Sequence, residues 1–359
     1  MSSLYERFVI GPGVFVSTFC SSVFRIEPYY FCDFGCIYCY ARRIIKNIPP
    51  LEFGYNLLKA FRKLLKVLKS RGVPIPVFRM STLTEPFQNI EKRLMISLKF
   101  LNECIRNNCK LIINTKSMLI LDEPWIDRLI ELNRNRNVLI QLSIMGVDDE
   151  KIKRVEPNAP PVSKRIEMIK ELSKIGIPVI VRIQPIIPGF NDEDAFDLIV
   201  EAYRFGAKQV IIEFLKLADI EELNIISKAI GLEIRKSLFY KPEFIDQYIV
   251  KSELRAKLLF SYLETARAKG IEFSTCKEGF IKYHTAEDCC GMHHLGKYVA
   301  KKTVSDVLLG KKKNKIIIEG EILEKMPHEI KKKVKKHYQI LNRILSEKIN
   351  ELLLDIETT

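Results

Sequence analysis

The chain has 359 residues, enough for one large domain with an extension or for two domains, and its 47% hydrophobic content is ample for a core. It has no uncharged apolar run of 18 residues and no charged N-terminal segment followed by an apolar stretch, so neither a membrane span nor a signal peptide is expected. Nine cysteines in such a chain indicate metal ligation rather than disulfides, and a cytoplasmic location. The net charge of +14 suits a polyanionic partner such as DNA or RNA, and equally a chain whose solvated faces are simply basic.

After a lead-in over 1–23, the hydrophobic pattern predicts strands that alternate with helices. The predicted strands are short apolar runs, and they cover 24–30, 76–83, 110–115, 138–145, 179–187 and 209–214. The predicted helices repeat apolar residues at helical spacing, and they cover 53–71, 90–105, 123–133, 162–175 and 192–205. Regular alternation of this kind indicates an α/β fold with a parallel sheet and right-handed crossovers.

The part of the chain beyond residue 240 is predicted to be mainly helical. A unit over 241–300 begins with a long helix, expected over 244–268, and continues with a cysteine-rich segment. A basic extension over 301–359 carries a second helix, expected over 329–354. Its lysines are Lys331, Lys332, Lys333, Lys335 and Lys336, and its apolar residues are Ile340, Ile344, Ile349, Leu352 and Leu353. This helix either contacts nucleic acid or packs its apolar face on the rest of the protein.

Three cysteines follow the first predicted strand at the spacing C-x3-C-x2-C. They are Cys32, Cys36 and Cys39, close enough for their thiolates to converge on one metal centre. A zinc site would need a fourth ligand nearby, but the first histidine of the chain is His284. A cubane iron–sulfur cluster takes one ligand per iron, so three cysteines would leave one iron open to a small molecule. Tyr38 precedes the last cysteine, where an aromatic ring can shield a cluster or stack on a bound ring.

This motif resembles that of the radical SAM superfamily, and the string GCIYCYAR resembles the subgroup related to spore photoproduct lyase, a DNA-repair lyase. The resemblance covers about residues 24–215 and implies a partial (β/α)6 barrel, placed here over 24–240. It also implies a [4Fe–4S] cluster and S-adenosylmethionine (SAM), bound at the open iron through its amino and carboxylate groups. One electron from a donor such as ferredoxin or flavodoxin would then cleave SAM to a 5′-deoxyadenosyl radical that abstracts hydrogen from the substrate.

The resemblance further implies that SAM is held by side chains at the carboxyl ends of the strands. The candidates for this role in the present sequence are Tyr38, Glu85, Ser143, Lys153 and Arg154. Glu85 occupies the Glu-Pro position after the second strand, where a carboxylate would pair with the SAM ammonium group. Ser143 would reach the ribose or the carboxylate, and Lys153 or Arg154 would meet the carboxylate. The sequence departs from spore photoproduct lyase at 76–88, where it has no cysteine at the place of that enzyme's hydrogen donor, which argues against repair of the same thymine lesion by the same mechanism.

A second group of cysteines lies in the 241–300 unit. Cys276, Cys289 and Cys290 fall within a short stretch and are followed by His293 and His294. Three cysteines with His293, His294, solvent or substrate as the fourth ligand would bind zinc or a second iron–sulfur cluster. The alternative is a redox-inert packing group. Cys20, by contrast, has no paired neighbour in the sequence and is interpreted as structural.

The sequence therefore indicates a radical SAM enzyme, with a nucleic acid as the favoured substrate on account of net charge and resemblance. One alternative is a radical SAM enzyme that acts on a peptide or a small metabolite and uses an auxiliary cluster. A second alternative is a non-catalytic iron–sulfur protein that binds nucleic acid.

Overall fold

A computed structural model describes residues 2–11, 20–41, 45, 51–242, 247–308, 310 and 314–347. Its centre is a seven-stranded sheet in the order β1-β2-β3-β4-β5-β6-β10, and every neighbouring pair of strands is parallel. The strands are β1 (Phe24–Ile26), β2 (Phe78–Met80), β3 (Leu111–Thr115), β4 (Val138–Ser143), β5 (Val179–Ile186), β6 (Gln209–Phe214) and β10 (Glu272–Thr275). The predicted α/β fold and partial barrel are confirmed. β1 and β10 stand at the two ends of this order and do not pair with each other in the described ranges, so the barrel is open on one side.

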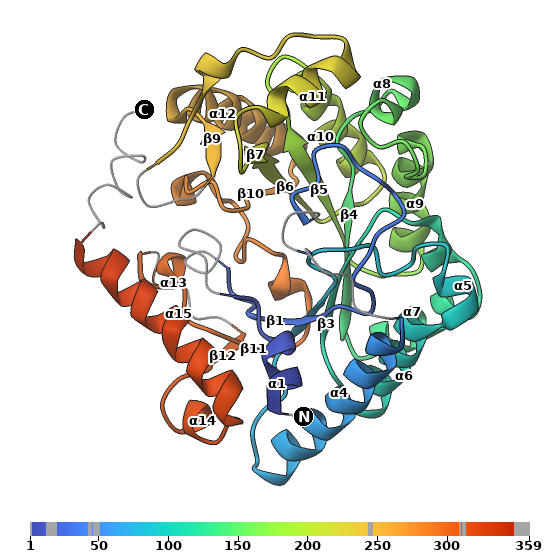
Figure 1. The fold of residues 1–359 in the computed structure, drawn as a ribbon, viewed down its shortest axis with the longest axis vertical. Helices are drawn as coiled ribbons and strands as arrows, with labels where there is room; N and C mark the ends of the chain where they lie inside the picture. The colour runs from blue at the N-terminus through green and yellow to red at the C-terminus, as the bar shows by residue number, and fades with distance from the viewer. Residues whose placement is uncertain are drawn as a thin grey trace.

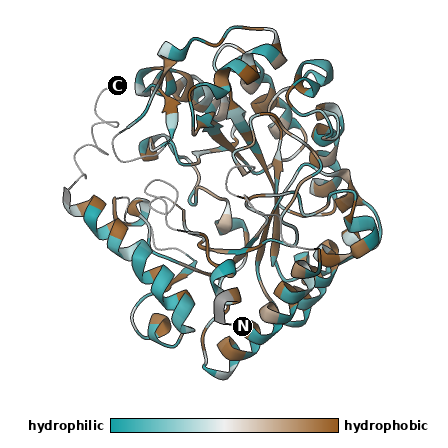
Figure 2. Cartoon of the chain, viewed as in Figure 1, coloured by the Kyte–Doolittle hydropathy of each residue, from teal (hydrophilic) through white to brown (hydrophobic). Residues whose placement is uncertain are grey.

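The helices between these strands lie along the outer side of the curved sheet (Figure 1). They are α4 (Glu52–Ser70), α5 (Glu91–Leu94), α6 (Ile96–Arg106), α7 (Trp125–Asn133), α8 (Asp149–Lys153), α9 (Val162–Lys174), α10 (Asp194–Arg204), α11 (Glu222–Ile230) and α12 (Ser252–Lys269). In Figure 2 the strands are mostly brown, the colour of hydrophobic residues, whereas the helices show teal faces toward solvent. The predicted helical periodicity therefore corresponds to one buried face on each of these helices.

The sheet extends beyond the barrel boundary expected at residue 240. The seventh strand, β10, follows α12 and pairs in parallel with β6, from Glu272 beside Gln209 to Thr275 beside Ile212. The long helix expected over 244–268 is shorter than predicted, because 248–250 form the strand β9 and α12 begins only at Ser252. β9 (Tyr248–Val250) pairs antiparallel with β7 (Lys216–Leu217) and β8 (Phe239–Tyr240). Residues 244–246 of the expected helix lie outside the described part of the chain.

The helix expected over 90–105 is broken into α5 and α6 at Met95, whose φ of 53° lies in the left-handed region. The break has a clear cause in the fully buried carboxylate of Glu91. This group accepts hydrogen bonds from the backbone N–H groups of Ser97 (3.0 Å) and Leu98 (2.9 Å). It thus caps the start of α6 and satisfies donors that a continuous helix would have bonded internally.

The inside of the barrel is filled by a segment from the C-terminal part of the chain. Strand residues that point inward, such as Ile112, Leu139 and Ile180, pack against Met292 and Tyr298. The next residues along β3, Leu111 and Ile113, belong to the separate cluster under the helices. This alternation follows from the two-residue period of a strand. The filling segment continues into β11 (Tyr298–Ala300), which pairs with β12 (Lys315–Ile317) across the boundary expected at residue 300.

The remaining elements surround the lead-in and the extension. They are α1 (Ser2–Tyr5), α13 (Val304–Leu308), α14 (Glu321–Glu324), α15 (His328–Glu347) and the 3-10 turns η1 (Glu6–Phe8), η2 (Met118–Leu121), η3 (Lys236–Leu238), η4 (Ile281–Tyr283) and η5 (Met292–His294). α15 buries Leu341 and Ile344 against Ile281 and Val304, so the packing interpretation of its apolar face is confirmed for 328–347. Ile349, Leu352 and Leu353 lie outside the described residues.

No helix in the described part of the chain is long and apolar enough to cross a lipid bilayer.

The contact between α15 and the lead-in is expected to depend on pH through His337. This imidazole is 2% exposed, and its Nε2–H donates to the carbonyl oxygen of Ile10 at 3.1 Å. Burial and the nearby Lys301 charge lower the pKa of His337 to about 4, against about 6.5 in an unfolded chain. The unfolded state therefore binds the proton first, and stability is lost as pH falls from 6.5 through 4. We expect a loss of about 3 kcal/mol across this window, measured by urea unfolding, and a smaller loss in His337→Gln. An equal loss in both proteins would contradict the assignment.

Candidate functional site

The loop with Cys32, Cys36 and Cys39 follows the carboxyl end of β1. It is fixed to the chain after α8, since the Ile37 N–H donates to the Val155 carbonyl at 2.9 Å. Cys32 is exposed, Cys36 is buried and Cys39 is half-buried. Backbone N–H groups of Phe34 and Glu85 point to the Cys32 sulfur, as they do around cluster thiolates. Three thiols on one loop with such donors fit an iron–sulfur cluster that keeps one iron free of protein ligands.

Burial governs the protonation of these thiols. It raises the pKa of Cys32 to about 12 and that of Cys36 to about 11. The Lys116 ammonium opposes this rise at Cys36. Without a metal both groups are therefore neutral thiols at neutral pH, and a bound metal would have to displace their protons.

A buried ion network holds the loop from the side of β3 and β4. The Glu156 carboxylate forms an ion pair with Arg165 at 2.7 Å and a second ion pair with Lys116. Its partner Lys116 also donates to the Tyr38 hydroxyl at 2.7 Å, and Tyr38 in turn donates to Glu156. Burial opposes ionisation of Glu156, but the charges of Arg165 and Lys116 outweigh it and lower the pKa to about 2. Glu156 is therefore a permanent anion that anchors Tyr38 next to Cys39.

The predicted SAM-binding residues are not all gathered at the cluster loop. Glu85 is there: its buried carboxylate accepts hydrogen bonds from Thr115 Oγ1 (2.6 Å) and the Lys116 N–H (2.8 Å), at the end of β3. Burial raises the pKa of Glu85 to about 7, against the effect of these hydrogen bonds. The hydroxyl of Tyr38 is also present, but it is engaged by Glu156.

The other candidates lie at the end of β4 or beyond it. Ser143 is the last residue of β4, and its carbonyl accepts from Arg165 at 2.8 Å. Lys153 is exposed at the end of α8, and Arg154 donates to the carbonyl of Ile230 at the end of α11 (3.2 Å). The basic residues in contact with the loop network are instead Lys116 and Arg165. Arg165 was missed, although a charged residue at an apolar position of the predicted helix 162–175 was a usable signal.

On the open side of the barrel, the end of β10 contacts the cluster loop. The Lys277 ammonium lies 5.2 Å from the centre of the Tyr40 ring, and Tyr40 directly follows Cys39. Lys277 also pairs with the buried Glu213 at 3.0 Å, and Arg182 pairs with the same carboxylate at 3.2 Å. Charged residues from β5, β6 and β10 thus line the carboxyl edge next to the loop.

In the structure Cys276, Cys289 and Cys290 lie close together, and Cys20 joins them. The sulfur atoms of Cys289 and Cys290 are 3.9 Å apart, and Cys276 packs in the same interior cluster. Cys20, which the sequence analysis treated as structural, has its thiol in hydrogen-bond contact with that of Cys290. No sequence signal pointed to this contact, because the two residues are 270 positions apart.

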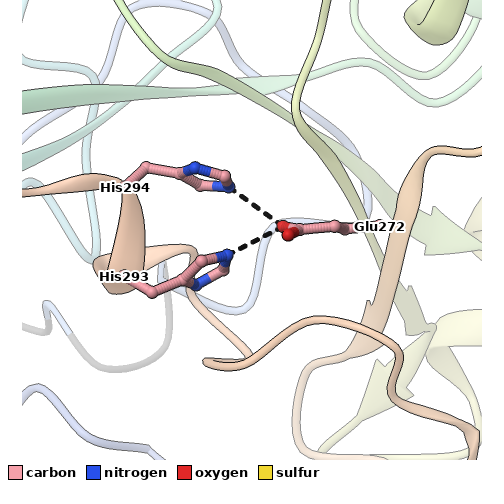
Figure 3. A group of neighbouring side chains, drawn as sticks. All are labelled: Glu272, His293 and His294. Atoms are coloured by element: carbon pink, nitrogen blue, oxygen red, sulfur yellow. Dashed lines mark hydrogen bonds and ion pairs between the residues drawn. The ribbon is translucent and has the colours of Figure 1, made fainter. Parts of the chain in front are cut away.

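His293 takes part in a different group. Figure 3 shows His293 and His294 directed at the same carboxylate, with Nε2–Oε2 distances to Glu272 of 2.8 Å and 3.0 Å. Burial opposes protonation of His293, but the hydrogen bond and charge of Glu272 raise its pKa above the usual value. These histidines line a cavity of about 430 Å³ at the amino ends of the strands, together with Arg134, Arg136, Lys208 and neighbouring backbone. The cavity lies at the opposite end of the barrel from the cluster loop.

Comparison with known proteins agrees with this geometry. Residues 26–201 match the sequence model of the family described as the Radical SAM superfamily. The matched part, just under half of the chain, holds the cysteine loop and the strands β2, β3, β4 and β5 of the sheet, and it is similar to members of the radical SAM superfamily. Members of this superfamily are enzymes that use a [4Fe–4S] cluster and SAM and need a reductant, so the resemblance stated from the cysteine loop is confirmed.

Individual relatives of this superfamily are distant. An uncharacterised protein of Methanocaldococcus jannaschii is 28% identical over 167 residues, which is 46% of this chain and 61% of that protein. A radical SAM Nα-GlyT isomerase of Pseudomonas phage M6 is 25% identical over 273 residues, 72% of this chain and 54% of the isomerase. The chain thus covers less than two thirds of either relative. A solved spore photoproduct lyase variant shares the fold with a TM-score of 0.50 and 15% identity, over 72% of this chain and 78% of that one.

Proposed function

We propose that this radical SAM protein binds SAM over the Cys32–Cys36–Cys39 loop and uses it to abstract hydrogen from a nucleic-acid substrate. The observation that carries the proposal is the loop itself, with three thiols, amide donors at Cys32 and the Glu85 carboxylate at the adjacent strand ends. The cluster, when bound, supplies the electron that cleaves SAM. The protein's own groups hold and orient SAM and keep water from the reacting atoms.

The proposed division of roles follows from charge and position. Cys32, Cys36 and Cys39 hold the cluster, and Glu85 accepts the SAM ammonium group. For the ribose or the carboxylate of SAM the sequence suggests Ser143, and for the carboxylate it suggests Lys153 or Arg154. Lys116 is an additional candidate for the carboxylate, because it contacts Tyr38 beside the cluster loop. The proposed electron donor is a ferredoxin or a flavodoxin.

The direct test is anaerobic reconstitution of the full chain, followed by counts of iron and sulfide and an assay for 5′-deoxyadenosine. SAM should perturb the spectrum of the reduced cluster, and 5′-deoxyadenosine should accumulate. A protein that binds iron and nucleic acid but shows neither effect would be the non-catalytic binder instead.

Glu85→Gln is expected to weaken SAM binding by roughly 10- to 100-fold and to leave the iron content unchanged. The reason is that the amide keeps the size of the side chain but loses the charge that would pair with an ammonium group. Equilibrium binding to the reconstituted protein measures the effect, with Glu131→Gln, a half-buried glutamate on α7, as a matched control. An unchanged affinity would assign the ammonium group to another residue.

The proposal of a nucleic-acid substrate rests on the net charge of +14 and on the resemblance to the lyase subgroup. The lysine run of α15 is partly neutralised within the chain. Lys331 and Lys335 pair with Glu324 at 3.0 Å and 2.8 Å, and Lys333 lies 3.7 Å from a carboxylate oxygen of Glu6. Lys332 and Lys336 remain exposed, as do Arg134 and Arg136 beside the cavity. A duplex would have to flip or unstack its target to reach the radical.

Binding of DNA and RNA across a salt series tests this proposal. Affinity should fall steeply as salt rises, because phosphate contacts release condensed counterions. The slope should become shallower by about one for each phosphate that a variant no longer neutralises. This change is expected in Lys332→Gln/Lys336→Gln if α15 binds phosphates, and in Arg134→Gln/Arg136→Gln if the cavity does. If both variants keep the salt dependence of the wild type, the phosphate contacts would instead lie at the carboxyl edge of the barrel. No binding at low salt would defeat the proposal and favour a peptide or small metabolite as substrate.

We also propose that Cys276, Cys289 and Cys290 hold a second iron–sulfur cluster. The support is their burial side by side in the interior of the barrel, apart from the first cysteine loop. This auxiliary cluster is also the feature that favours the alternative substrate class, a peptide or small metabolite.

A further inference from the structure

Four cysteines from three segments meet inside the open side of the barrel. Cys20 precedes β1, Cys276 directly follows β10, and Cys289 and Cys290 lie in the loop before η5. The Cys289 and Cys290 sulfur atoms are 3.9 Å apart, and the Cys290 thiol also lies beside that of Cys20, which donates to the Ser22 carbonyl at 2.9 Å. Cys276 packs with Cys289 and Cys290 and forms a hydrogen bond with Arg182. The group thus bridges the two edge strands of the sheet.

These cysteine segments are fixed by one buried carboxylate. Asp288 accepts a hydrogen bond from Ser21 Oγ at 2.7 Å with one oxygen. Its other oxygen accepts from the backbone N–H groups of Cys290 at 2.8 Å and Met292 at 3.2 Å. Asp288 therefore holds the residue after Cys20 and the backbone of Cys290 at the same place, although they are far apart in the sequence. Three hydrogen bonds to one carboxylate therefore fix the position of Cys20 relative to Cys290.

Buried positive charge faces the same cysteines. Arg79 from β2 and Arg182 from β5 are each 6% exposed, and both donate to Gln141 Oε1, at 2.8 Å and 3.1 Å. The amide nitrogen of Gln141 donates in turn to the carbonyl of Cys290 at 2.8 Å. Arg182 has a carboxylate partner in Glu213.

Arg79 has no such partner. Within the described ranges of the chain no carboxylate forms an ion pair with Arg79, whose other hydrogen bond goes to the amide oxygen of Asn114 at 3.2 Å. The ionisable groups that it faces are the sulfur atoms of Cys290, Cys20 and Cys276. A buried guanidinium is costly unless an anion compensates it. An oxidised cubane bound by four thiolates is dianionic and would supply that charge.

We infer that Cys20, Cys276, Cys289 and Cys290 together ligate the second iron–sulfur cluster, with Arg79 and Arg182 compensating its charge. This inference rests on the proposed second cluster and replaces His293 by Cys20 as the fourth ligand. The adjacent pair Cys289–Cys290 departs from the C-x2–4-C spacing typical of zinc, whereas two irons of one cubane take one thiolate each. The Nε2 atom of His293 is engaged by Glu272 at 2.8 Å, so His293 could ligate only through its buried Nδ1 atom.

A fourth cysteine changes what this cluster can do. With four protein thiolates it has no open iron, so it binds neither SAM nor substrate and is left with electron exchange and a structural role. Its ligand Cys276 is followed by Lys277, whose ammonium lies 5.2 Å from the centre of the Tyr40 ring, and Tyr40 follows Cys39 of the first loop.

The test uses full-length protein that carries Cys32→Ala/Cys36→Ala/Cys39→Ala, so that only the second centre remains. After anaerobic reconstitution this protein should hold about four irons per chain and give the EPR signal of a reduced cubane. Adding Cys20→Ala should remove or degrade this signal and lower the iron count, whereas adding His293→Gln or the distant Cys109→Ala should change neither. Cys20→Ser, which is nearly isosteric, keeps the packing and should shift the EPR signal even where Cys20→Ala does not fold. Arg79→Gln should make the reduction potential of the cluster more negative, because a compensating positive charge is lost.

The outcomes separate this inference from the proposals on which it rests. An unchanged cluster in Cys20→Ala, with loss in His293→Gln, would overturn the ligand set and leave the second cluster standing. If the triple variant binds no iron, both the second cluster and its proposed ligand set are wrong. SAM cleavage by the wild type would still support the first site in that case. Zinc taken up in preference to iron would overturn the assignment as an iron–sulfur centre.

Discussion

Cys36→Ala is expected to abolish SAM cleavage and to remove the iron held by the first loop. Cys36 is the buried member of the three cysteines, and the remaining two thiols cannot hold a cubane that takes one protein ligand on each of three irons. The loop backbone should survive the change, since its contact with Val155 uses the Ile37 N–H. The measurements are the rate of 5′-deoxyadenosine formation and the iron content after reconstitution.

The control for this substitution is Cys109→Ala, which removes another buried thiol that lies just before β3. It should retain the wild-type rate and iron content. Full cleavage activity in Cys36→Ala would sink the assignment of the cluster loop.

Arg165→Met is expected to lower the free energy of unfolding by about 3 kcal/mol, since it leaves the buried Glu156 carboxylate with Lys116 as its remaining cationic partner. Arg165 and Glu156 are each 1% exposed at the side chain, so water cannot replace the lost partner. Methionine keeps much of the volume and removes the charge, which isolates the electrostatic effect. The midpoint of urea unfolding measures the change.

Lys164→Gln supplies the matched comparison. Lys164 is adjacent in sequence and pairs with Glu167 at 2.9 Å, but both side chains are more than half exposed. Exposed pairs contribute little, so this variant should differ from the wild type by less than about 0.5 kcal/mol. Equal changes in the free energy of unfolding would show that the buried network stabilises the protein no more than an exposed ion pair does.

The barrel could be predicted from the sequence because local hydrophobic patterns encode its strands and helices. Two predicted strands end where the structure ends them, at Thr115 and Phe214, but the other four were extended too far. At β1 the cause is visible, because the strand ends at Ile26, before Pro28, which has no N–H to continue a ladder. β10 escaped prediction because four residues after a long helix give too short a pattern. Its pairing with β6 joins segments that are far apart in the sequence, so no local pattern encodes it.

Prediction of the site was limited by the same distinction between local and distant contacts. The cysteine loop is one short string, so its motif was readable. The contact between Cys20 and Cys290 joins opposite ends of the chain, and no local pattern encodes it. His293 was grouped with the cysteines because it is close to them in sequence, and its hydrogen bond with Glu272 could not be predicted from a local pattern.

The segment that fills the barrel has a consequence for how the chain reaches its native state. The backbone N–H of Lys301 bonds to the Ser21 carbonyl at 3.2 Å, and Asp288 bonds to the Ser21 side chain. These contacts form only after some three hundred residues have left the ribosome, so the first strand emerges long before the interior that covers it. Because contacts of such sequence separation slow folding, the barrel should pass through a long-lived intermediate with an exposed apolar interior. Its yield in expression should therefore depend on chaperones and on the rate of synthesis.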